Sequence, residues 1–116
     1  MGEVLNLERG VLLWRTRMGR KTAVRYLDVL SVALRPKGWR FIKLYRPAPT
    51  PLLRVYACGP EEIGIMVSVL AVPGGAWGYH EAPRGRRGYL APCGDAKAAA
   101  DVVDGLLKHR MYPSTW

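Results

Sequence analysis

The sequence is short of acidic residues, of cysteine and of long apolar runs. Its 116 residues include 9 acidic side chains against 18 basic ones, so the formal net charge at pH 7 is +9. The two cysteines, Cys58 and Cys93, are too few for the disulfide framework that stabilises small secreted domains. No apolar run approaches the roughly 20 residues that a membrane-spanning helix requires. We therefore expect a protein with reduced thiols and no contact with a membrane.

The first residues also lack the features of a targeting signal. Residues 1–8 include two acidic and no basic residues, whereas a secretion signal begins with basic residues. The apolar run at residues 11–14 is too short for the core of such a signal. Asn6 stands where the myristoylation pattern needs Ser or Thr. These absences predict a cytoplasmic location.

Motifs for metals and cofactors are missing as well. The cysteines and the two histidines, His80 and His109, do not stand at ligand spacings such as Cys-x2-Cys or His-x3-His. The Gly74-Gly75 pair lacks the strand–loop–helix context and the lysine of a phosphate-binding loop. We expect neither a metal site nor a cofactor.

What the chain does contain is enough apolar residues, 49% of the total, for one domain with its own core. Residues 63–72 carry apolar side chains at both odd and even positions, a pattern typical of a central strand. Pro73-Gly74-Gly75 is a strong turn signal, so we expect residues 77–82 to pair antiparallel with this strand.

Two helices and further strands surround this hairpin in the sequence. The spacing of Ala23, Leu27, Leu30 and Leu34 predicts a helix over 20–35. Asp95 is a good N-cap for a second helix over 95–110, which residues 111–116 follow as a tail. Residues 39–46, 52–57 and 89–91 read as strands, so antiparallel strands occupy 39–91.

Residues 3–18 leave two interpretations open. Val4, Leu7, Val11, Trp14 and Met18 recur at spacings of three and four, as on one face of a helix. Gly10 interrupts this pattern, and residues 11–14 could instead form a short strand. In either case the order of elements predicts an α+β fold: a single two-layer domain with an antiparallel sheet of about four to five strands and helices packed on one face.

The C-terminal third carries a resemblance. The run Gly-Tyr-Leu-Ala-Pro-Cys-Gly-Asp at 88–95, which opens an alanine-rich helix, and the ending at 107–116 are similar to small uncharacterised proteins common in actinobacteria. The resemblance covers roughly the last 40 residues. It implies a cytoplasmic, non-secreted protein and carries no activity over to this chain.

The surplus positive charge is concentrated in the first part of the chain. Residues 9–46 hold 11 basic residues and one acidic residue, Asp28. If these cations gather on one exposed side, as we expect, their field attracts nucleic acid or an acidic protein. A merely solvated basic surface is the alternative.

Nine basic residues are the candidates for binding an anion, and three aromatic residues that alternate with them along predicted neighbouring strands are candidates for stacking on bases. The alternative for the aromatic residues is that Trp39, Phe41 and Tyr45 share the parity that faces the core. The anion-binding candidates are Arg15, Arg17, Arg20, Lys21, Arg25, Arg40, Lys43, Arg46 and Arg54; the stacking candidates are Trp39, Tyr45 and Tyr56.

One pair of residues could react. Cys93 lies just before a predicted helix, where backbone N–H groups can lower a thiol pKa, and His80 could serve as its base. The flanking proline and glycine also fit a plain turn with an unreactive cysteine.

These observations predict a non-enzymatic binding module that recognises nucleic acid or another polyanion through its basic N-terminal third. A homodimeric or accessory protein-interaction subunit, using an edge strand and Trp116, is the alternative. A small-molecule binder or enzyme near Cys93 and His80 is a third hypothesis.

Overall fold

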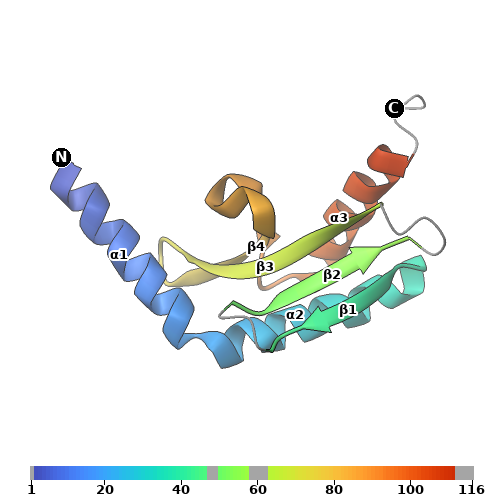
Figure 1. Ribbon diagram of the computed structural model, residues 1–116, viewed down its shortest axis with the longest axis horizontal. Helices are drawn as coiled ribbons and strands as arrows, with labels where there is room; N and C mark the ends of the chain where they lie inside the picture. Colours follow the sequence, from blue (N-terminus) through green and yellow to red (C-terminus); the bar gives the residue numbers. More distant parts are fainter. Residues whose placement is uncertain (1, 47–49, 58–62, 112–116) are drawn as a thin grey trace.

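The described residues form a five-stranded antiparallel sheet in the order β1-β2-β3-β4-β5 (Figure 1). The computed structural model describes residues 2–46, 50–57 and 63–111, and the side chains of 10–46, 50–57 and 63–110. Each strand pairs with the strand before it in the chain, so the sheet is a simple meander. The strands are β1 (Arg40–Leu44), β2 (Leu52–Tyr56), β3 (Gly64–Val72), β4 (Ala76–Glu81) and β5 (Tyr89–Pro92).

Helices α2 and α3 cover one face of this sheet, and α1 extends past the end of the β3–β4 hairpin (Figure 1). Two short 3₁₀ segments, η1 after α2 and η2 between β4 and β5, complete the described secondary structure. The predicted α+β class is confirmed. The helical elements are α1 (Gly2–Met18), α2 (Arg20–Leu34), η1 (Arg35–Lys37), η2 (Ala82–Gly88) and α3 (Ala96–Met111).

Strand β3 lies in the middle of the sheet and is apolar on both faces. Ile65, Val67 and Val69 are buried in the main core, together with Leu27 and Leu30 of α2. The β3–β4 turn uses Gly74 and Gly75 at φ angles of +87° and +76°, a backbone region that disfavours other residues. We refer to the other face of the sheet, away from α2 and α3, as the open face.

Segment η2 lies beside the open face and covers part of it. It consists of two turns joined at Gly85, which has a φ of 56°. The Arg86 Nη1 donates a hydrogen bond of 2.7 Å to the carbonyl of Ala71 in β3. Ser68 and His80, which pair across β3 and β4, are both buried. A stretch that reads as an arginine-rich loop in the sequence therefore packs against the sheet.

The C-terminal half of α1 is held against the β3–β4 hairpin by polar contacts. The Arg15 guanidinium donates hydrogen bonds to the carbonyls of Val72 (3.1 Å) and Ala76 (3.2 Å). It also lies 5.5 Å from the ring centroid of Trp77. The Thr16 hydroxyl accepts a 3.0 Å hydrogen bond from the backbone N–H of Ala71. Residues 2–18 thus form one helix whose inner side is fixed by the sheet.

Close packing continues at the junction of α1 and α2. A Cβ atom on Gly19 would lie 2.2 Å from Cη2 of Trp77, nearer than any ordinary contact. Glycine is therefore required here for space, although it is a poor helix former. Gly10, in the middle of α1, has no atom within 4 Å of the same position, so no packing explains its presence.

We predict opposite effects for alanine at these two glycines. Gly19→Ala should lower the free energy of unfolding by about 1–3 kcal/mol, because the added methyl group overpacks against Trp77 and alanine is a poor N-cap for α2. Gly10→Ala, the matched control, should raise it by up to about 1 kcal/mol. Urea denaturation of both variants measures this. Equal stabilisation by the two substitutions would show that Trp77 does not pack on the junction.

Candidate functional site

Three of the predicted anion-binding residues make contacts inside the protein instead. Arg15 holds α1 on the hairpin, as described above. Arg20, at the start of α2, donates a hydrogen bond to the carbonyl of Tyr45. Lys43 of β1 forms an ion pair of 2.9 Å with Asp28 of α2. These cations join the first two helices to the sheet.

Asp28 collects polar contacts from β1 and the residue after it. Its carboxylate accepts a hydrogen bond of 2.8 Å from the Tyr45 hydroxyl as well as the contact from Lys43. Burial tends to raise the pKa of Asp28, but the hydrogen bonds from Lys43 and Tyr45 outweigh it, and the pKa is lowered below its usual value. Asp28 therefore stays ionised and offsets Lys43, which weakens the positive field at this edge of the sheet.

Four other predicted residues near the junction of α1 and α2 are exposed and form no ion pair with a described carboxylate: Arg17, Lys21, Arg25 and Arg46. Arg40, at the far end of α2, is exposed in the same way. Arg17, Lys21 and Arg25 follow one another at intervals of four residues across the junction of α1 and α2. Arg46 comes directly after Tyr45, whose carbonyl contacts Arg20 at the same junction. We call these four residues the junction patch.

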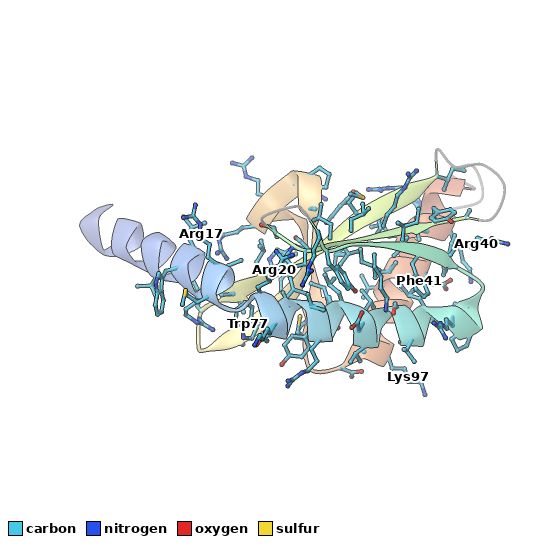
Figure 2. All side chains as sticks on the ribbon, turned by 60° about the horizontal axis from the view of Figure 1, so that its bottom comes forward. Arg17, Arg20, Arg40, Phe41, Trp77 and Lys97 are labelled. Carbon is cyan, nitrogen blue, oxygen red and sulfur yellow. The ribbon has the colours of Figure 1, made fainter. Side chains whose placement is uncertain are left out.

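The cations do not all gather on one side, contrary to the expectation from the sequence. Figure 2 shows Arg17 and Arg20 near the junction and Arg40 at the end of the molecule farthest from α1. Helix α2, whose 15 residues span about 22 Å at 1.5 Å per residue, lies between the two positions, and this length exceeds the screening length of about 8 Å at physiological salt. The basic residues of the first third therefore act as at least two separate groups.

The aromatic residues of the two strands divide between the two faces of the sheet. Trp39 is buried and its Nε1 donates a 2.7 Å hydrogen bond to Asp104 of α3, so it is not available for stacking. Tyr45 is half-buried and bonded to Asp28, and burial raises the pKa of its hydroxyl. For Trp39 and Tyr45 the structure therefore fits the alternative given in the sequence analysis, in which these residues face the core.

Tyr56 is the stacking candidate that remains on the open face. The Arg54 guanidinium lies 5.6 Å from its ring centroid, and Arg40 stands opposite Tyr56 in the β1–β2 register. The strand neighbours Ile42 and Leu44 add apolar side chains to this face. Proteins that bind single-stranded nucleic acid present a row of aromatic side chains on which successive bases stack. The open face offers one half-buried tyrosine and two arginines, so it provides a much smaller stacking surface.

Cys93 and His80 do not form a reactive pair. Cys93 is buried in the core on the helix side, in the same cluster as Tyr79. His80 follows Tyr79 in β4 and so faces the opposite side of the sheet. There its Nδ1 lies 2.9 Å from the carbonyl oxygen of Gly78, and its ring meets Tyr89 edge-to-face at 5.4 Å. The sheet separates the two side chains.

The pKa shifts oppose reactivity at both residues. Burial raises the pKa of the Cys93 thiol to about 12, the opposite of the activation that a helix start would supply. Burial also lowers the pKa of His80, and nearby Arg86 adds to this, although the contact with the Gly78 carbonyl partly opposes it. The neutral forms of both groups are therefore favoured.

We predict that Cys93 reacts slowly in the folded protein. The other cysteine of the sequence, Cys58, lies outside the described residues. The variant Cys58→Ser removes it and leaves Cys93 as the only thiol. A thiol with a pKa near 12 is almost entirely protonated at pH 8, so labelling by a disulfide reagent should be at least about 100-fold slower than in the urea-unfolded protein. Adding His80→Gln should leave the rate unchanged. Fast labelling of the folded protein that becomes slower in the His80→Gln variant would contradict this prediction and support a reactive pair of Cys93 and His80.

The open face carries a groove that the sequence analysis did not predict. Two adjoining hollows of about 350 and 440 Å³ run along it beside η2. A third of about 380 Å³ continues from them toward the junction, where Thr16 of α1 and Ala23 of α2 line it. Leu52, Met66 and Leu70 form much of the floor of the groove, Arg54 lines one end, and Arg17 and Arg86 line the other. The sequence signal that could have predicted this groove is the pair of apolar residues at even positions of β3, Met66 and Leu70, which lie on the open face.

The described part of the chain contains no cluster of three or more His, Cys, Asp or Glu side chains that could hold a metal ion. None of its helices is long and apolar enough to cross a bilayer.

Comparison with protein-family models, curated proteins and solved structures found no match to this chain. The resemblance to small actinobacterial proteins, part of which falls on residues 112–116 outside the described range, stays a prediction.

Proposed function

We propose that this chain is a non-enzymatic binding module for nucleic acid or another polyanion, and that the junction patch makes the contact. The observation that carries the proposal is the exposure of Arg17, Lys21 and Arg25 without an ionic partner in the described structure. Side chains that a protein needs for its own ion pairs are not free to neutralise a ligand. Arg17, Lys21 and Arg25 form no ion pair with the described residues, whereas Arg15 donates hydrogen bonds to backbone carbonyls and Lys43 pairs with Asp28.

The local electrostatics of the junction support an anionic ligand. The first turn of α2 contains Arg20 and Lys21 and no acidic residue. A helix start carries a partial positive charge, which acidic residues usually balance there. Cations at this position add to that charge, so a phosphate or carboxylate group bound nearby relieves their repulsion. Asp28, the single acidic residue of α2, lies in the middle of the helix and is already engaged by Lys43 and Tyr45.

We predict that binding depends on salt and on the patch. A labelled DNA duplex and a labelled single strand are titrated by anisotropy at two salt concentrations. Neutralised phosphates release counterions, so Arg17→Ala, Lys21→Ala and Arg25→Ala together should lower the slope of log K against log salt by about 2.7 for the duplex. At low salt the triple variant should bind at least about tenfold more weakly.

The matched control removes the same charge elsewhere. Arg84, Arg87 and Lys97 are exposed and also lack an ionic partner among the described residues. Their triple alanine variant should retain most of the affinity. Equal losses in the two variants would show that net charge, not the junction patch, attracts the ligand, and no binding at low salt would remove the proposal.

A second function is supported by a different observation, the exposed apolar side chains of α1. Trp14 is 63% exposed and Met18 is 70% exposed, although the helix is fixed to the sheet on its other side. Large apolar side chains that stay in contact with water beside one another mark surfaces that bind other proteins. We propose a protein-interaction subunit as the alternative to polyanion binding, and the two functions are compatible because they use different residues.

A further inference from the structure

Helix α1 has two different sides along its C-terminal half. Leu12, Arg15 and Thr16 lie on the inner side, where they are buried or bonded to the hairpin. Val11, Trp14 and Met18 are 54%, 63% and 70% exposed. On a helix of 3.6 residues per turn these three share a stripe turned away from the inner side.

The stripe has the spacing of a coiled-coil seam. Val11, Trp14 and Met18 are separated by three and four residues, as at the a and d positions of a heptad repeat. In the sequence, Val4 and Leu7 continue the same spacing toward the N-terminus of α1. Five apolar residues at heptad spacing on one helix fit the matching stripe of another helix.

We propose that this stripe pairs with the same stripe of a second copy of the chain, with the two α1 helices antiparallel about a two-fold axis near Val11. The proposal rests on the protein-interaction function stated above. We assign a second copy of the chain as the partner because the charges of this segment complement those of the same segment in the opposite direction. A two-fold contact requires such a surface, one that complements itself.

The charge argument also sets the direction of the helices. Residues 1–8 contain two acidic residues and no basic ones, and residues 9–25 contain six basic residues and no acidic ones. Antiparallel pairing brings the acidic end of each helix toward the basic end of the other, and opposite charges attract there. Parallel pairing would bring the basic ends together, at a cost in repulsion.

The position of α1 leaves room for this arrangement. The helix extends past the end of the β3–β4 hairpin, away from α3 (Figure 1). Its 17 residues span about 25 Å at 1.5 Å per residue. An antiparallel pair would place the two sheets at opposite ends of the helices and one junction patch near each end. A dimer would thus present two basic surfaces to a long polyanion.

Light scattering and sedimentation equilibrium over a range of protein concentrations test the pairing. The wild-type chain should have twice the monomer mass of 12.9 kDa at tens of micromolar. The double variant Val11→Glu and Met18→Glu should be a folded monomer with an unchanged circular dichroism spectrum and at least a tenfold weaker association. The matched control, Val32→Glu and Val102→Glu, alters exposed apolar residues of α2 and α3 and should remain dimeric.

Two outcomes would overturn the pairing: a wild-type monomer throughout the range, or a dimer that the α1 variant leaves intact. In the latter case the chain is still a protein-interaction subunit, so the failure of the pairing is distinguishable from the failure of the function. Controlled oxidation in the Cys58→Ser background tests the direction. Val11→Cys, near the axis, should form a disulfide between copies, whereas Met18→Cys should not. A Met18→Cys disulfide would indicate parallel helices and contradict the proposal.

Discussion

The contact between Arg15 and the β3–β4 hairpin determines how the rest of the surface is presented. Its guanidinium group satisfies two carbonyls at the hairpin end and lies over Trp77, so it fixes both the position and the rotation of α1. Because that rotation turns Leu12 and Thr16 inward, the stripe with Trp14 must face outward. The same contact brings the start of α2 beside the sheet, where Arg20 reaches the carbonyl of Tyr45.

Charge along the chain is a poor guide to charge on the surface in this protein. Residues 9–46 include most of α1, all of α2 and β1, and these elements run along the length of the molecule (Figure 1). Positive charge that is concentrated in one part of the sequence is therefore distributed along the length of the molecule. Some of these charged residues also connect helices to the sheet, because arginine and lysine can reach carbonyls and carboxylates across a packed interface. What remains for a ligand is the smaller junction patch.

The sequence predicted those parts of the fold in which a local pattern has one interpretation. The apolar residues at both odd and even positions of 63–72 and the glycines of the turn specify the β3–β4 hairpin. The stripe of Leu27, Leu30 and Leu34 specifies α2. Strand β1 was ambiguous because both of its faces mix apolar and basic residues. The packing of α2 and α3, which supply Asp28 to Tyr45 and Asp104 to Trp39, decides which face is buried.

The candidate site was less predictable for the same reason. Whether His80 and Cys93 share a face depends on the register of β4 and β5, which shifts at Tyr79 and His80, and no local pattern encodes that shift. The groove depends on where η2 lies relative to β3, a contact between distant segments made through Arg86. The exposure of the α1 stripe likewise follows from Arg15, since the periodicity of residues 4–18 shows a stripe without saying which way it faces.

Amide hydrogen exchange of an Arg15→Gln variant tests most directly whether this arginine orients α1. Hydrogen bonds from a charged group contribute about 1.5–3 kcal/mol, so the amides of residues 11–18 should exchange at least about tenfold faster, with those of β3 unchanged. Arg17→Gln, which removes the same charge from the exposed side, should exchange like the wild-type chain. Unchanged protection of α1 in the Arg15 variant, or an equal loss in the Arg17 variant, would contradict the account.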